Sequence, residues 1–301
     1  LLAETPWVTD SQSEEEKKKM LATLFDLQKM KDSQKTILEK LTQKQKSSGG
    51  FAWFDGGEEN EYVTRHIISG LGHLQKLSKN ATGDFDKITQ KGVSYLDQKF
   101  LENHKRTEVL NKSQKLLWNY PYNNLHYLYA RSFYFEKYPL PESTLLITKK
   151  YTENIKENWL QYSLYEKGLA SLVLSRFGEK ETAKKILESL RQTSSNNEDW
   201  GMYWIENKAG WYWYQAPIET QALLIEAFAE IENDKKSVDA MKVWLLKNKQ
   251  NKNWPTTKAT TEAVYALLMQ GTDWISVKDK TIIKLGDEKI ITKKLAENDK
   301  E

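Results

Sequence analysis

Residues 199–232 decide the fold of this chain, and they read DWGMYWIENKAGWYWYQAPIETQALLIEAFAEIE. A loop rich in tryptophan and tyrosine runs into Ala216-Pro217, and an apolar helical pattern follows. Pro217 suits the first turn of a helix, where its missing N–H leaves no hydrogen bond unmade. The stretch therefore predicts an aromatic turn followed by a largely buried helix.

Two other places in the chain repeat this unit. The sequence GFAWF at residues 50–54 precedes a helical pattern at 62–71, and Trp254-Pro255 precedes another at 260–268. In each unit a threonine occupies the same place in the pattern, namely Thr64, Thr220 and Thr261. A repeated turn-and-helix unit is typical of a repeat architecture.

The remaining sequence extends this pattern to about ten helices of two kinds. Helices that follow an aromatic turn are apolar on most sides, and they lie near residues 64, 126, 166, 220 and 261. The helices near residues 95, 148, 185 and 240 carry one charged face. Because helices that are apolar all round are buried and amphipathic helices lie outside, we expect an all-α fold, an alpha/alpha toroid of helical hairpins with five inner helices.

The C-terminal end has a different pattern. Gly286-Asp287 separates two runs rich in β-branched residues within 280–292, and such a turn is a hairpin signal. We therefore expect two parts: a toroid over residues 1–272, and a β-hairpin segment over residues 273–301 that belongs to an adjacent β domain.

Composition excludes several functional classes. The net charge of +3 is spread over interspersed charges, so we expect no nucleic-acid partner. No apolar run has the length of a membrane span, and residues 1–4 do not resemble a signal peptide, so we interpret the chain as a fragment or mature segment. With no cysteine and only four histidines, we expect no metal and no cofactor. His66 and His73, two turns apart on one helix face, are interpreted as packing or surface residues.

Three motifs and the C-terminal change to β structure resemble the thioester domain of alpha-2-macroglobulin and complement proteins, in particular of large bacterial alpha-2-macroglobulin-like proteins. Residues 49–54 resemble the family's Gly-Gly-aromatic-x-Trp turn. Residues 218–224 resemble its Glu-Thr/Ala-x-Ala-Leu-Leu helix, and residues 254–260 its last inner-helix start. The resemblance covers about residues 1–290.

The resemblance implies a non-enzymatic part of a secreted endopeptidase inhibitor, a protease trap located in the periplasm or on the outer-membrane surface. Its partners would be proteases, which the parent protein encloses after they cut a bait region, and adjacent β domains of the same chain. The family's thioester forms within a Cys-x-Glu-Gln motif, which this chain lacks because it has no cysteine. A complete toroid of the family has six inner helices, so the resemblance places the missing first unit, with any thioester, upstream of Leu1.

The aromatic loop offers a candidate binding surface, because tryptophan and tyrosine are favoured at interfaces. The alternative interpretation is that these side chains cap the core of the toroid. The candidate residues are Trp200, Tyr203, Trp204, Trp211, Tyr212, Trp213 and Tyr214.

An enzyme of the alpha/alpha-barrel type, a glycoside hydrolase or polysaccharide lyase, is the alternative function. Glycoside hydrolases commonly use two carboxylates, one as an acid and the other as a base or nucleophile. Nothing in the spacing selects a pair, and acidic residues in turns are commonly caps or solvated charges, so we assign no catalytic residue. The carboxylates on the relevant loops are Asp55, Glu58, Glu59, Asp199 and Glu219.

Overall fold

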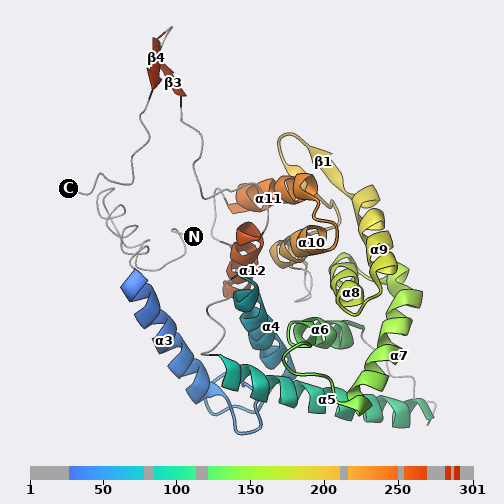
Figure 1. The fold of residues 1–301 in the computed structure, drawn as a ribbon. Coiled ribbons are helices and arrows are strands. Elements are labelled where there is room, and N and C mark those ends of the chain that lie inside the picture. The colour runs from blue at the N-terminus through green and yellow to red at the C-terminus, as the bar shows by residue number, and fades with distance from the viewer. Residues whose placement is uncertain are drawn as a thin grey trace.

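The computed structural model describes residues 27–77, 85–112, 121–210, 216–249, 254–269, 282–285 and 288–291. Within these ranges the chain forms ten α-helices, one short 3-10 helix and two small β-hairpins. Figure 1 shows the helices in two layers, one enclosed by the other. This confirms the expected all-α fold of helical hairpins.

The inner layer consists of the helices that the sequence predicts to be buried. They are α4 (Glu61–Leu77), α6 (Pro121–Ser132), α8 (Leu164–Arg176), α10 (Pro217–Ile231) and α12 (Thr257–Leu268). Each packs on the next, from α4 through α6, α8 and α10 to α12. Helix α10 is the most deeply placed, with every residue from Ile218 to Ala229 buried.

The outer layer consists of amphipathic helices. They are α3 (Leu27–Lys44), α5 (Asp86–Lys112), α7 (Glu142–Asn158), α9 (Lys180–Thr193) and α11 (Lys235–Lys249). Helix α5 packs on α4 and α6, α7 on α8, α9 on α8 and α10, and α11 on α10 and α12. Helix α9 illustrates the amphipathic pattern of this layer. The charged side chains of α9 face water, while its apolar side chains are buried: Ala183, Ile186, Leu187 and Leu190.

Local sequence signals fix where several helices begin. Ser163 and Glu166 form a reciprocal capping box at the start of α8. Pro217 occupies the first turn of α10, as the sequence predicts. Thr256 caps α12 by accepting a hydrogen bond from the backbone N–H of Ala259 at 3.0 Å.

Part of the aromatic loop is a β-hairpin rather than irregular chain. Strand β1 (Ser195–Asn197) pairs antiparallel with β2 (Gly201–Tyr203). Gly201 adopts a φ of +68°, and a Cβ at this position would lie 2.0 Å from the carbonyl oxygen of Ala240 in α11. The hairpin thus depends on glycine for its close approach to α11.

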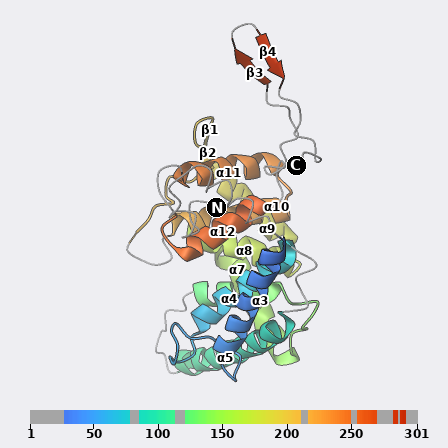
Figure 2. The ribbon, with the colours of Figure 1, turned by 90° about the vertical axis from the view of Figure 1, so that its left-hand side faces the viewer.

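The predicted C-terminal hairpin is also present. Strand β3 (Ile282–Leu285) pairs antiparallel with β4 (Glu288–Ile291). The division into parts at residues 1–272 and 273–301 stays a prediction. Among the helices of the described ranges, none combines the length and apolar character that crossing a bilayer requires. Figure 2 shows the same elements from the side.

Candidate functional site

Aromatic turns meet at one end of the inner layer. Lys258 at the start of α12 places its Nζ 5.8 Å from the ring centroid of Tyr62 and 6.0 Å from that of Tyr165. Tyr62, in the first turn of α4, stacks on Trp53 at 5.6 Å and lies 6.3 Å from the ring of His126 in α6. The inner helices α4, α6, α8 and α12 therefore begin close together, and we call this region the N-terminal end of the ring.

The predicted aromatic surface divides between solvent and core. Trp200 is 49% exposed, and Lys247 places its Nζ 5.7 Å from the indole centroid. Tyr203 is half-buried against the core. Trp204 is only 1% exposed, and its Nε1 donates a hydrogen bond to the carbonyl of Leu190 at 2.9 Å. Trp204 is thus a core residue rather than a surface residue. The other four candidates lie outside the described residues: Trp211, Tyr212, Trp213 and Tyr214.

The three repeated threonines lie near the starts of inner helices, as predicted. Thr64 and Thr220 are each the fourth residue of their helix and are buried. The Thr64 hydroxyl also accepts a hydrogen bond from the backbone N–H of Phe51 at 2.9 Å, which ties the aromatic turn to α4. In α12 the fourth residue is Thr260, and Thr261, the fifth residue, is exposed.

A cavity of about 440 Å³ opens between α4 and α12 at the N-terminal end of the ring. Helix α4 contributes Tyr62 and His66 to its wall, and α12 contributes Lys258 and Glu262. Trp53 adds an indole that is 64% exposed. Aromatic walls with a few convergent charged groups are typical of small-molecule sites.

Buried charges from two helices converge beside this cavity. Burial lowers the pKa of Lys258, and the carboxylates of Glu219 and Glu262 oppose that shift. Burial raises the pKa of Glu262 to about 7, against the effect of Lys258. Glu219 is 6% exposed and accepts a hydrogen bond from the Thr256 hydroxyl at 3.5 Å. The carboxylates of Glu219 and Glu262 therefore act electrostatically on the half-buried ammonium of Lys258.

Of the five candidate carboxylates, only Glu219 lies inside the ring. Asp55 is exposed and pairs with Lys44 at 2.7 Å, and Glu59 accepts a hydrogen bond from Ser48. The remaining two, Glu58 and Asp199, are exposed. Glu262 is the carboxylate that the sequence analysis missed. It occurs within a helix rather than in a turn, and no local pattern distinguishes it.

A second buried network links all five inner helices further along the ring. The centre is Glu226 of α10, which is 1% exposed. Tyr129 of α6 and Tyr265 of α12 donate hydrogen bonds to its two oxygens, the latter at 3.1 Å. Arg176 of α8 contacts the same carboxylate at 2.5 Å. His73 of α4 completes the set, with its Nε2 2.6 Å from the Tyr129 hydroxyl.

The environment of this network separates the pKa values of its members. Burial works to raise the pKa of Glu226, but Arg176, His73 and Lys76 together lower it to about 2. Burial lowers the pKa of His73 to about 4, although the nearby Glu226 carboxylate acts to raise it. The carboxylate is thus ionised and the imidazole neutral at neutral pH.

The histidines are packing residues, in agreement with the sequence-based interpretation. His73 is 4% exposed and stacks on Tyr265 with ring centroids 3.7 Å apart. His126 is 2% exposed, and its ring lies 4.7 Å from that of His66. Across the described parts of the chain, no group of three or more histidine, aspartate or glutamate side chains is arranged to hold a metal ion.

Comparison with known proteins finds similarity among solved structures. No protein-family profile matches the chain, and no curated protein matches it. Among solved structures, the chain is similar to native alpha-2-macroglobulin from Escherichia coli, in a crystal structure that spans domain MG7 to the C-terminus. The TM-score is 0.44 at 13% sequence identity, and the match covers 77% of this chain and 33% of the other. The motifs of the sequence resemble the same family.

Proposed function

We propose that this chain is a non-enzymatic helical domain of a larger alpha-2-macroglobulin-like protein that traps proteases. The observation that best supports this proposal is the position of the three family-like motifs in the fold. Residues 49–54 form the turn before α4, residues 218–224 lie in the first two turns of α10, and residues 254–260 lead into α12. All three motifs therefore mark starts of inner helices, which is the position that the resemblance assigns to them.

Helix α12 meets α4 directly. His73 of α4 stacks on Tyr265 of α12 with ring centroids 3.7 Å apart, so the five inner helices meet around the Glu226 network. The resemblance attaches any thioester to a Cys-x-Glu-Gln motif. This chain has no cysteine, and we assign no thioester chemistry to it.

The N-terminal end of the ring is the surface best suited to an adjacent β domain of the parent protein. Apolar side chains in three turns that precede inner helices are more than 45% exposed. They are Trp53, Phe54, Leu160, Trp200 and Ile205. Exposed apolar patches mark protein contacts more often than isolated apolar residues do. The parent would act outside the cytoplasm, in the periplasm or on the outer-membrane surface, where it meets proteases.

Limited proteolysis of the parent protein tests this proposal. The intact protein is treated with a panel of proteases, and its sedimentation coefficient and any retained protease are measured. Compaction with retention of the protease supports the trap. Absence of both would reject it. Pre-treatment with methylamine adds a separate readout, since a gain of one methylamine mass reports an upstream thioester.

A carbohydrate-active enzyme is the second candidate, because the carboxylates of Glu219 and Glu262 both act electrostatically on Lys258. Pairs of titratable groups in different environments are typical of acid–base catalysis. Incubation with neutral and acidic polysaccharides, followed by assay of reducing ends, tests this function. Turnover that Glu262→Gln abolishes would establish the enzyme, and absence of turnover on every substrate would eliminate it.

A further inference from the structure

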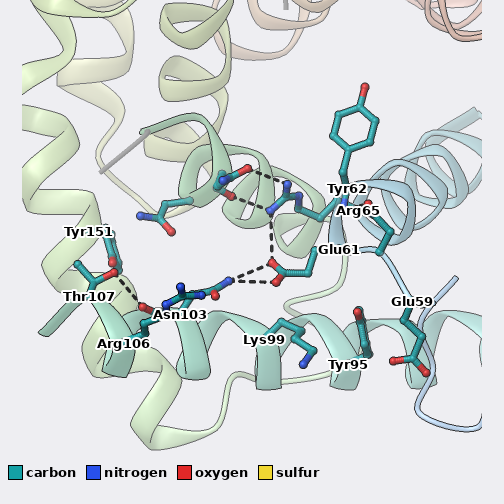
Figure 3. A pocket seen from close by; sticks show the side chains of 13 residues that line it. Glu59, Glu61, Tyr62, Arg65, Tyr95, Lys99, Asn103, Arg106, Thr107 and Tyr151 are labelled. Carbon is teal, nitrogen blue, oxygen red and sulfur yellow. Dashed lines mark hydrogen bonds and ion pairs between the residues drawn. The ribbon is translucent and has the colours of Figure 1, made fainter. Parts of the chain in front are cut away.

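A cavity of about 580 Å³ between the inner and outer layers shows how buried polar groups of this chain pair with one another (Figure 3). The guanidinium of Arg65 donates to the Asn123 side chain at 2.9 Å and lies 3.8 Å from Glu61. Asn103 donates to the same carboxylate at 3.0 Å. Inside the ring, by contrast, the Nδ1 of His73 is buried and has no hydrogen-bond partner among the residues that the structure describes. A buried polar atom without a partner costs free energy unless a nearby group can satisfy it.

The hydrogen bonds of Tyr129 determine which ring nitrogen of His73 carries the proton. The Tyr129 hydroxyl has one proton, which it donates to the carboxylate of Glu226. Its oxygen lies 2.6 Å from the Nε2 of His73, so Nε2 is the donor in that contact. Burial keeps the imidazole neutral because it lowers the pKa of His73 to about 4. A neutral imidazole carries a single N–H, and the Nδ1 of His73 is therefore an acceptor.

The carboxyl group of Glu262 is positioned to satisfy this acceptor. Its Oε2 lies 3.8 Å from the Nδ1 of His73, and a small rotation of the side chain brings the two atoms to the hydrogen-bond distance of about 3 Å. A carboxylic acid has a proton to donate, whereas a carboxylate only accepts. Ionised Glu262 would therefore set two acceptors against each other, and the protonated form is the one that pairs with His73.

The groups around Glu262 divide between those that favour its protonated form and those that favour its ionised form. Burial raises the pKa of Glu262 to about 7, and the carboxylates of Glu226 and Glu219 add to the shift. Lys258, one turn earlier on α12, opposes the shift and offers the ionised carboxylate an alternative partner. The other titratable groups near Glu262 come from α4 and α6: Tyr62, His66, His73 and Tyr129.

We propose that Glu262 is a pH-operated latch between α12 and α4. In its protonated form Glu262 donates to the Nδ1 of His73, and hydrogen bonds then run without a break from α12 through α4 and α6 to Glu226. As the pH rises, Glu262 releases its proton to solvent, turns toward Lys258 and leaves Nδ1 unpaired. The latch consists of side chains of this chain alone, so it rests on neither the protease trap nor the candidate enzyme.

The latch has two structural consequences. The His73 ring stacks on Tyr265 of α12, so the hydrogen bond from Glu262 strengthens or weakens a contact that joins the two helices in both states. Glu262 and Lys258 also line the cavity of about 440 Å³ between α4 and α12. Ionisation of Glu262 therefore changes that wall from a neutral acid beside an ammonium group to an ion pair.

NMR of the imidazole nitrogens in the ¹⁵N-labelled chain tests the latch. Long-range ¹H–¹⁵N spectra distinguish a protonated ring nitrogen from an unprotonated one, and the chain has only four histidines. Nuclear Overhauser contacts with the Tyr265 ring, on which His73 stacks, identify its signals. We expect Nε2 to carry the proton throughout the range from pH 5.5 to pH 9. The Nδ1 shift should titrate within this range, with its midpoint at about pH 7.

Three variants separate the latch from a purely structural role of Glu262. Glu262→Gln should abolish the titration of Nδ1, because an amide donates at every pH. Lys258→Gln should raise the midpoint by about one pH unit, because it removes the cation that favours the carboxylate. Glu58→Gln is the matched control, since Glu58 is exposed before α4, and it should leave the midpoint unchanged. Circular dichroism confirms that each variant is folded.

Several results would overturn the proposal. In the unmodified chain these are a proton on Nδ1 instead of Nε2, and an Nδ1 shift that stays constant over this pH range. Both decide the question even if a variant fails to fold. A titration that persists in Glu262→Gln, or a midpoint that Lys258→Gln lowers, would assign the pH dependence to another group and reject the latch.

Discussion

Replacing Glu262 with glutamine should make this protein more stable at alkaline pH. Its side chain is 20% exposed and lies 3.8 Å from the Nδ1 of His73, which is neutral at neutral pH. Burial raises the pKa of Glu262 to about 7, in spite of the nearby Lys258. Ionising this carboxyl in the folded state therefore costs free energy that the unfolded chain avoids. Glutamine keeps the shape and removes the charge.

The size and sign of the effect follow from linkage. A carboxyl whose folded pKa is raised destabilises the fold above that pKa and has no such effect below its unfolded value. The shift from 4.5 to about 7 corresponds to about 3 kcal/mol as an upper limit. We expect Glu262→Gln to raise the free energy of unfolding by about 1–3 kcal/mol at pH 8. At pH 5 the gain should be below about 1 kcal/mol.

Urea unfolding at a series of pH values measures this difference. The Glu262→Gln variant and the unmodified chain share the Glu226 network, so the pH dependence that this network contributes cancels when their stabilities are subtracted. Glu58→Gln is the matched control, since Glu58 is exposed in a turn, and it should change stability by less than about 0.5 kcal/mol at every pH. A gap between Glu262→Gln and the unmodified chain that stays constant with pH would refute the reasoning. So would a variant that is less stable at pH 8.

Four further substitutions test the packing. Substitutions at two glycines of α4 should change the free energy of unfolding in opposite directions. The Cβ added in Gly70→Ala meets nothing within 4 Å, so this variant should be more stable by about 0.5–1 kcal/mol. The Cβ added in Gly72→Ala would lie 2.5 Å from Phe133, so this variant should be less stable by about 1–3 kcal/mol. Urea midpoints with equal shifts would contradict this. Leu224→Ala should cost about 2–5 kcal/mol, because Leu224 is fully buried, and a loss below about 1 kcal/mol in the same assay would contradict its inner position. Gly201→Ala should lower the free energy of unfolding by more than about 2 kcal/mol, which a lower thermal midpoint would report. An unchanged midpoint would mean that β2 can move away from α11.

The sequence by itself determined the helices and their two kinds. Periodic apolar residues and local caps act over three or four neighbours, so α10 begins where Pro217 indicates. The distinction between inner and outer helices also follows from local pattern, since it depends only on whether one or all sides of a helix are apolar. The sequence signal that predicts the pairing of β3 with β4 is equally local.

Only the tertiary structure decided which side chains meet inside the ring. Lys76 and Glu226 are 150 residues apart in the chain, and Tyr129 and Glu226 are 97 apart, so no window of sequence contains either pair. The tertiary structure also decided the different burial of two tryptophans in one loop. Trp200 is 49% exposed and Trp204 is 1% exposed, because only Trp204 reaches the core, where the carbonyl of Leu190 accepts its hydrogen bond. Residue type gives a side chain its chemistry, but its burial and its partners exist only once distant helices have packed around the same centre.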